Sequence, residues 1–254
     1  MIRILIDVHC HANLYLTLSN IIEDARQVGV EKIIAVAMSS MSQERIIAIS
    51  NQYKEIFPAL GIHPEEIKVN KKIESELDKV SEYIISHGKE ICAIGEIGLD
   101  HHFIKEKELY PLQERVFNRM LSLAQELQLP VNLHTKGAEK TVFETLPSYR
   151  IPNINIHWYS GPEKYLKIGM DRGYYFSITP AIDYSPAVRK VVALIDIDHL
   201  LLESDGPVKY GELTGAPSLL LNTLKAVSTI KNIEIEEMNN QIEQNTRTIF
   251  PKIF

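Results

Sequence analysis

The chain alternates between eight short segments rich in β-branched and aliphatic residues and longer segments with a helical hydrophobic period. Successive short segments start between 21 and 39 positions apart, which leaves room for a crossover helix and two loops. Repeated units of this kind predict a parallel sheet covered by helices. The expected strands are Ile2–Val8, Lys32–Met38, Ile56–Ile62, Ile91–Ile97, Pro130–Leu133, Asn153–Ile156, Tyr174–Ile178 and Leu200–Glu203.

Two of the intervening segments carry a clear helical stripe. Apolar residues recur at helical spacing over residues 18–28, and Gly29 follows as the expected C-terminal cap. A second stripe covers residues 112–127, with Pro111 at an early helical position. In this second helix we expect the polar side chains to face solvent, namely those of Gln113, Glu114, Arg115 and Arg119.

Eight strand–helix units in 254 residues predict an α/β fold of the (β/α)₈ TIM-barrel type. Because no internal repeat, low-complexity tract or flexible linker divides the chain, we expect one domain over residues 1–254. An open doubly wound sheet is the alternative fold. Such a sheet normally has a Gly-rich phosphate turn after its first strand, where this chain has Asp7-Val-His-Cys-His11.

Composition and charge indicate the cellular compartment of the protein and the partners that it attracts. Its apolar runs stop far short of the roughly 18 residues of a membrane span, and Asp7 and His9 interrupt any secretory signal. Two cysteines without a CxxC pair suit a reducing compartment, so we expect a cytoplasmic protein. A net charge of −6 gives no overall attraction to DNA or acidic lipid, so a nucleic acid would have to be captured locally.

Six potential metal ligands stand at the C-terminal ends of different expected strands, and in a barrel these ends converge on one axis. Imidazoles suit zinc, manganese or nickel, and carboxylates can bridge two ions. Six ligands exceed the need of one tetrahedral ion, so we predict two divalent cations with Glu96 between them. These donors do not distinguish Mg²⁺, Mn²⁺, Zn²⁺, Co²⁺ and Ni²⁺. The six residues are His9, His11, Glu96, His134, His157 and Asp205.

Each of these residues also has a purely structural interpretation. A His-x-His pair occurs by chance, and the two strand-ending histidines could be hydrogen-bonded core residues. Glu96 could pair with a core cation, since a buried carboxylate needs a partner, and Asp205 before Gly-Pro could simply form a turn. Their common position at the strand ends favours metal binding over these interpretations.

Six motifs, in order over nearly the whole chain, resemble those of the TatD-type metal-dependent hydrolases of the amidohydrolase superfamily. They are Asp7-Val-His-Cys-His11, Gly61-Ile-His-Pro64, Gly95-Glu-Ile-Gly-Leu-Asp100, Leu133-His134, His157-Trp-Tyr-Ser-Gly161 and Glu203-Ser-Asp-Gly-Pro207. The resemblance implies a two-metal barrel with deoxyribonuclease activity, often as a 3′ exonuclease. It also implies that His9, His11, Glu96 and Asp205 hold one ion, and that Glu96, His134 and His157 hold the other.

Other residues are expected to act on the substrate. His63 resembles the family's Gly-x-His-Pro histidine and is predicted to touch substrate. Lys136 stands near the position of a phosphate-clamping arginine of the family, and a lysine attracts phosphate without a bidentate grip. Glu203 is predicted either to bind the scissile end or to support a histidine. His101 and His102 replace a tyrosine common in the family, and we expect both to be solvated loop residues.

These observations predict a deoxyribonuclease that uses two cations to activate water and Asp205 to orient that water and accept its proton. Its expected partner is DNA, as single strands or 3′ ends, with no membrane and no obligate protein partner. An amidohydrolase cleaving a cyclic amide, lactone or formyl substrate is the alternative, which Lys136 in place of arginine keeps open. A non-catalytic metal-holding protein is a third hypothesis, and it would need closed coordination.

Overall fold

In the computed structural model, which describes residues 4–70 and 72–254, eight strands form one parallel sheet whose order follows the sequence. Ile2 and Arg3 of the first expected strand lie outside the described residues. The strands are β1 (Leu5–Cys10), β2 (Val30–Val36), β3 (Ile56–Leu60), β4 (Ala93–Gly98), β5 (Val131–His134), β6 (Ile154–Ile156), β7 (Tyr175–Ile178) and β8 (Leu200–Leu202).

The two edge strands of this sheet meet through hydrogen bonds beyond the strand ladder. The Asp7 carboxylate on β1 accepts the backbone N–H of Ser204, just after β8, at 2.9 Å. The backbone N–H of Asp205 donates to the carbonyl of His9, also at 2.9 Å. The sheet is therefore nearly closed as the predicted TIM barrel. Its sequential strand order rules out the doubly wound alternative, whose order reverses at a switch point.

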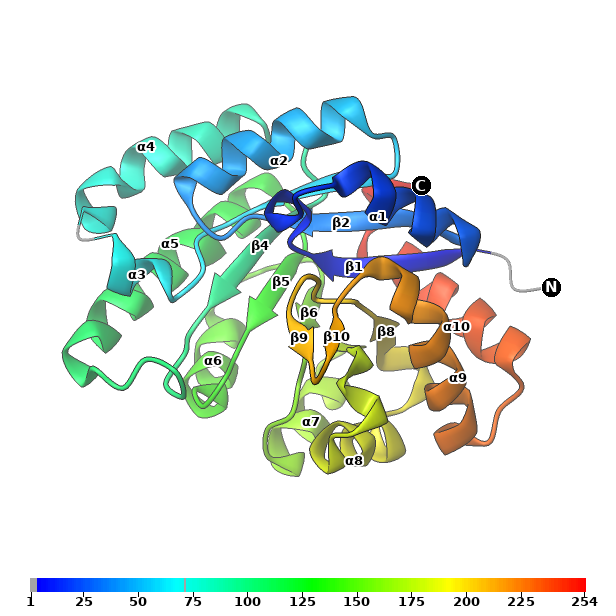
Figure 1. The fold of residues 1–254 in the computed structure, drawn as a ribbon. Coiled ribbons are helices and arrows are strands. Elements are labelled where there is room, and N and C mark those ends of the chain that lie inside the picture. The colour runs from blue at the N-terminus through cyan, green and yellow to red at the C-terminus, as the bar shows by residue number, and fades with distance from the viewer. Residues whose placement is uncertain (1–3, 71) are drawn as a thin grey trace.

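Helices follow the strands and cover the outside of the barrel, and the last helix lies beside β1 (Figure 1). No helix in the described part of the chain combines the length and apolar character that crossing a membrane requires. A short hairpin of β9 (Lys209–Tyr210) and β10 (Leu213–Thr214) follows β8. The helices are α1 (Leu18–Gln27), α2 (Ser40–Gln52), α3 (Glu66–Val69), α4 (Ile73–Ser86), α5 (Tyr110–Leu127), α6 (Glu139–Thr145), α7 (Glu163–Asp171), α8 (Pro186–Leu194), α9 (Leu220–Lys231) and α10 (Ile235–Ile249).

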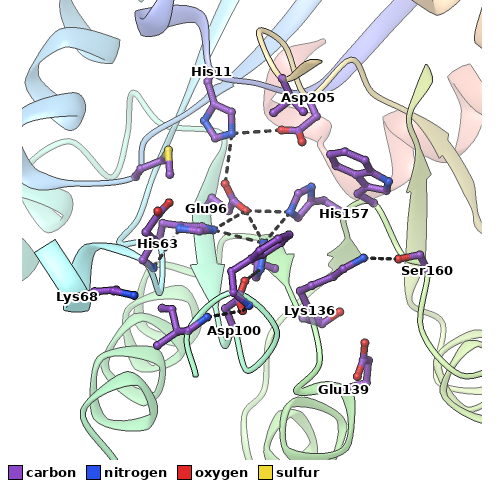
Figure 2. A pocket seen from close by; sticks show the side chains of 18 of the residues that line it. His11, His63, Lys68, Glu96, Asp100, Lys136, Glu139, His157, Ser160 and Asp205 are labelled. Atoms are coloured by element: carbon purple, nitrogen blue, oxygen red, sulfur yellow. Dashed lines mark hydrogen bonds and ion pairs between the residues drawn. The ribbon is translucent and has the colours of Figure 1, made fainter. Parts of the chain in front are cut away.

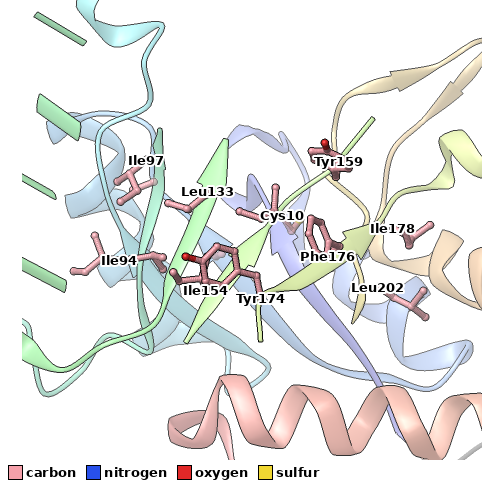
Figure 3. Close-up of a cluster of buried hydrophobic side chains, with 14 of the residues drawn as sticks. Cys10, Ile94, Ile97, Leu133, Ile154, Tyr159, Tyr174, Phe176, Ile178 and Leu202 are labelled. Carbon is pink, nitrogen blue, oxygen red and sulfur yellow. The ribbon is translucent and has the colours of Figure 1, made fainter. Parts of the chain in front are cut away.

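Alternation along the strands divides the core into two clusters. The larger cluster lies between strands and helices, and Figure 3 shows part of it, including Ile94 of β4 and Phe176 of β7. The smaller cluster fills the barrel interior with side chains such as Val8 and Ile34. Phe250 near the C-terminus joins this inner cluster, so the end of the chain packs against the interior of the barrel.

The two helices with the clearest stripes form as predicted, with one exception on α5. Gly29 after α1 has φ +88°, the left-handed conformation expected of a cap. Pro111 occupies the first turn of α5. The prediction that Gln113 faces solvent is wrong: its side chain is fully buried. Gln113 accepts the backbone N–H of Asp100 at 2.9 Å and donates to the Asp100 carbonyl at 3.1 Å, so it fastens the loop after β4.

Candidate metal centre

The structure brings the six predicted ligands together at the C-terminal end of the barrel. His9 belongs to β1, which continues to Cys10, two residues beyond the predicted strand end. Glu96 lies within β4, and His134 is the last residue of β5. The other three ligands, His11, His157 and Asp205, follow β1, β6 and β8 directly or within three residues. Because the ends of five strands and the loops after them converge, residues distant in sequence share one site.

Glu96 lies at the middle of this centre, with His11 and Asp205 on one side and His157 on another (Figure 2). Its Oε2 atom lies 3.4 Å from His9 Nε2 and 3.5 Å from His11 Nε2. The same two nitrogens lie 3.5 Å and 3.2 Å from Asp205 Oδ1. We call His9, His11 and Asp205 the first ligand group.

The other oxygen of Glu96 faces a different set of imidazoles. Glu96 Oε1 lies 2.8 Å from His157 Nε2 and 3.2 Å from His134 Nδ1. These two nitrogens are 3.3 Å apart. We call His134 and His157 the second ligand group. Each carboxylate oxygen of Glu96 thus serves one group.

The donor atoms of the centre fit divalent cations. Ligand atoms around a tetrahedral ion with bonds of about 2.1 Å lie about 3.4 Å apart, close to the separations in the first group. Within the described chain, His9 Nε2 and Asp205 Oδ1 are buried without a hydrogen-bond partner. Buried polar atoms rarely remain unpaired. A bound cation would explain why these two atoms have no hydrogen-bond partner.

Charges within the centre compensate one another strongly. Burial opposes ionisation of Glu96, but the imidazoles of His63, His157 and His9 outweigh it and hold the pKa of Glu96 well below its usual value. Burial likewise opposes protonation of His157, yet Glu96 and Glu203 raise its pKa to about 10. Without cations, protonated imidazoles therefore balance the carboxylates, and a cation would replace those protons.

Asp100, part of a sequence motif but without a predicted role, supports His134. Its Oδ2 lies 2.8 Å from His134 Nε2. Its Oδ1 accepts the backbone N–H groups of His102 and Phe103 at 2.8 Å and 2.6 Å. Burial opposes ionisation of Asp100, but hydrogen bonds with His134 and the backbone outweigh it and lower its pKa, so the ionised carboxylate accepts and His134 Nε2 donates. Nδ1 of His134 is left facing Glu96.

His63 reaches the same centre, and its contact with substrate stays a prediction. Its Nε2 lies 3.4 Å from Glu96 Oε1. Its Nδ1 accepts the backbone N–H of Glu65 at 3.2 Å, and a backbone N–H can only donate. Burial lowers the pKa of His63 and favours the neutral ring. The neutral ring then carries its proton on Nε2, so His63 offers a hydrogen-bond donor to the centre.

A cavity of about 590 Å³ opens over these residues. Lys136 lines it and donates from Nζ to Ser160 Oγ at 2.8 Å. Phe103, whose side chain is largely exposed, also lines the cavity. The remaining walls are mostly apolar, with Met38, Val69, Ile104, Trp158 and Val208 among the lining residues.

Glu203 lies behind the centre, fully buried, and does not line this cavity. Its Oε1 lies 3.6 Å from His157 Nδ1. This position favours support of a histidine over contact with the scissile end, the two roles predicted for Glu203. His101 stacks on Tyr110 with ring centroids 3.7 Å apart, and His102 is exposed. Neither histidine lines the cavity. The predicted solvated position holds for His102 and is wrong for His101, whose ring packs on Tyr110 and whose Nε2 is buried.

Comparison with known proteins places this chain in a family and identifies structures with a similar fold. The family model of TatD related DNase matches residues 6–251. Human deoxyribonuclease TATDN3 is 29% identical, with 98% of this chain and 95% of that protein covered. The uncharacterized metal-dependent hydrolase MJ1582 of Methanocaldococcus jannaschii is 30% identical, with 97% of each covered. The crystal structure of YJJV, a TatD homolog from Escherichia coli K12, superposes with a TM-score of 0.89 at 24% identity, covering 99% of both chains. The match over almost the whole length shows that this chain belongs to the TatD related DNase family.

Proposed function

We propose that this protein is a metal-dependent deoxyribonuclease that hydrolyses phosphodiester bonds at DNA 3′ ends. Membership of the TatD related DNase family supports this function, and the human relative is named a deoxyribonuclease. The observation that carries the proposal is Glu96, whose two oxygens face two separate ligand groups beneath an open cavity. A shared carboxylate between two sets of donors can hold two cations as close together as two-metal hydrolysis needs them.

We assign one divalent cation to the first ligand group with Glu96 and a second to the second ligand group with Glu96. When bound, two such cations acidify an attacking water and offset negative charge that develops on the phosphate. The donor atoms of both groups come from the side chains of this chain alone. The cavity leaves substrate free to approach them from one side.

Asp205 is the proposed proton acceptor. It lines the cavity. Burial opposes ionisation of Asp205, but the neighbouring imidazoles of His11 and His9 outweigh burial and lower its pKa. An ionised carboxylate at this position can orient the attacking water and take its proton.

His63 and Lys136 are the proposed substrate-binding side chains. The Nε2–H of His63 points into the centre, where it can donate to a phosphate oxygen. Lys136, whose Nζ bonds Ser160 in the free protein, supplies a positive charge for the phosphate. Two cations and Lys136 thus provide local attraction that the acidic chain lacks as a whole.

A strand end suits the cavity better than the middle of a duplex. The ligand side chains are between 0% and 14% exposed, so the centre lies at the cavity floor. A flexible single strand reaches such a floor, and Phe103 offers an exposed aromatic face on which a base can stack. We further propose that residues 1–254 act as one catalytic domain in the cytoplasm, where the buried thiols Cys10 and Cys92 stay reduced.

The test uses protein stripped of metal and then given Mg²⁺, Mn²⁺, Co²⁺ or Zn²⁺. Single-stranded DNA labelled at its 5′ end should shorten progressively, and DNA labelled at its 3′ end should release the label first. Failure of all four ions to restore nucleotide release would contradict the proposal. Cleavage of a cyclic amide or lactone without cleavage of DNA would establish the amidohydrolase alternative instead.

A further inference from the structure

Three neighbouring strands each carry one buried polar residue between apolar neighbours. These residues are Asn132 on β5, Asn155 on β6 and Ser177 on β7, all fully buried. Glu203, directly after β8, is fully buried as well. Burying polar groups costs free energy unless each finds a partner. The four side chains are joined in one chain of hydrogen bonds.

The direction of the first bonds follows from a backbone carbonyl. Asn132 donates from Nδ2 to the carbonyl of Val8 at 2.7 Å, and a carbonyl can only accept. The Asn132 amide oxygen is therefore the atom that lies 3.0 Å from His9 Nδ1. Since that oxygen accepts, His9 holds its proton on Nδ1. The lone pair of its Nε2 then points toward Glu96.

Donors and acceptors can be assigned in the same way along the chain of hydrogen bonds as far as the second ligand group. Asn155 Nδ2 lies 3.2 Å from the Asn132 oxygen and 2.9 Å from Ser177 Oγ, so it donates to both. Ser177 is then free to donate its hydroxyl proton to Glu203 Oε2 at 2.5 Å. The other oxygen of Glu203 accepts the backbone N–H of Trp158 at 2.7 Å. The same oxygen lies 3.6 Å from His157 Nδ1, an ion-pair contact that is longer than a hydrogen bond.

We propose that Asn132, Asn155, Ser177 and Glu203 are positioning residues that fix His9 and His157 with Nε2 toward the cations. The inference rests on the two-cation centre proposed above. It adds that one ligand of each cation is coupled to the other through the barrel interior, independently of Glu96. Such coupling is expected because hydrogen bonds in series strengthen one another in a buried, low-dielectric setting.

Packing of the barrel does not explain these polar residues. The inner cluster on the opposite strands is apolar, with Ile34 and Val36 on β2, Ala59 on β3 and Ala93 on β4. A barrel interior can therefore be filled without amide or hydroxyl groups. The polar side chains lie on β5, β6 and β7, between Asn132, which contacts His9, and Glu203, which faces His157. A role in holding these two imidazoles requires this placement.

The variants Asn155→Ala and Ser177→Ala break the chain without touching either imidazole. We expect each to weaken Zn²⁺ binding by about 10-fold, the lower end of the effect of losing a direct hydrogen-bond partner of a ligand, because each acts on an imidazole through Asn132 or Glu203. Affinity is measured by competition with a chromophoric chelator. The Co²⁺ absorption spectrum should change in parallel, because it reports the geometry of the ligands.

Asn245→Ala is the matched control. Asn245 is a buried asparagine whose Nδ2 donates to the carbonyls of Ile197 and Leu200, at the start of β8 and away from the centre. Its loss should lower the melting temperature and leave Zn²⁺ affinity and the Co²⁺ spectrum unchanged. Equal loss of affinity in Asn245→Ala and Ser177→Ala would show a general stability effect and overturn the proposal.

Two further measurements test the direction of the hydrogen bond from His9 and the coupling between the members of the hydrogen-bond chain. In the Zn²⁺-loaded protein, ¹⁵N NMR should show His9 with a protonated Nδ1, and an unprotonated Nδ1 would overturn the proposal. The double variant Asn132→Ala/Ser177→Ala should lose less affinity than the product of the two single losses. Independent, multiplicative losses would show that no coupled chain exists.

These measurements use no nucleic acid, so they separate two kinds of failure. Wild-type protein that binds Zn²⁺ beside variants that bind it equally well would defeat only the positioning chain. Wild-type protein that binds no divalent cation would defeat the proposed function and this inference together.

Discussion

The two ligand groups on either side of Glu96 are assembled in different ways. In the second group, His157 contacts Glu96 at 2.8 Å, and His134 is backed by Asp100 at 2.8 Å. In the first group, the contacts among donors are 3.2 to 3.5 Å, and the facing atoms of His9 and Asp205 have no hydrogen-bond partner within the described chain. Direct hydrogen bonds hold the second group, whereas the first group is left for a cation to complete.

The two groups also differ in the residues that contact the imidazole nitrogens facing away from Glu96. Carboxylates, Asp100 and Glu203, stand behind the second group, whereas a neutral amide, Asn132, stands behind His9. A carboxylate behind an imidazole raises its basicity as a ligand. We therefore expect the second cation to bind more tightly, and the first cation, next to Asp205, to exchange more easily.

The largest effect should follow from Glu96→Gln, because this change removes the carboxylate that both groups share. We expect nuclease activity to fall by more than about 10⁴-fold, beyond the contribution of one acid–base group. Metal analysis should show loss of both ions. Glu55→Gln is the control, since Glu55 is buried but pairs with Arg26 away from the centre. Two tightly bound ions in Glu96→Gln would contradict the shared role.

Asp205→Asn should affect the first group alone. Turnover should fall by about 10²- to 10⁴-fold because the proton acceptor is lost. At least one cation should remain, held by His134 and His157, and the melting temperature should change little. Metal content, single-turnover rates and thermal unfolding check these expectations. Full activity in this variant would remove Asp205 from the mechanism.

Asp100→Asn should act on the second group instead. The amide can present a donor to His134 Nε2 where the carboxylate accepted, so the ring is no longer held with Nδ1 toward Glu96. We expect the tighter cation to bind about 10- to 100-fold more weakly, with the other affinity nearly unchanged. Stepwise titration with Mn²⁺ measures both affinities. Weakening of only the looser site would reverse our assignment of the two groups.

Lys136→Ala should have the smallest effect, because Lys136 lies at the cavity wall and belongs to neither group. We expect KM for single-stranded DNA to rise by about 3- to 10-fold, roughly 1 kcal/mol, with kcat nearly constant. Lys140→Ala is the control, since Lys140 is exposed on α6 beside Glu144. A fall in kcat at constant KM would place Lys136 in the chemical step.

The sequence predicts the barrel and the six ligands because their signals are local. Each strand is a short apolar run, and each ligand lies near or just after its C-terminal end, as His134 does on β5. Strand limits shift by a few residues, because pairing with neighbouring strands decides where a strand ends. Cys10, for example, pairs with Ala35 of β2 and extends β1 past the predicted end at Val8.

The supporting residues could not be predicted in this way, because their role depends on contacts distant in sequence. The helical pattern predicts that Gln113 faces solvent, and only the packed structure shows that it holds the loop of Asp100. The sequence does give a weak indication of the buried hydrogen-bond chain. A polar residue interrupts each of three apolar strands at its centre, namely Asn132, Asn155 and Ser177. One such residue is unremarkable, whereas three on successive strands indicate a shared partner in the interior.

The central claim is that two cations bind on opposite sides of Glu96. Anomalous diffraction from crystals grown with Mn²⁺ or Zn²⁺, recorded at the absorption edge of the metal, tests it most directly. We expect two peaks, one among His9, His11 and Asp205 and one beside His134 and His157, with the second group more fully occupied. A single peak at saturating metal, or peaks away from Glu96, would contradict it.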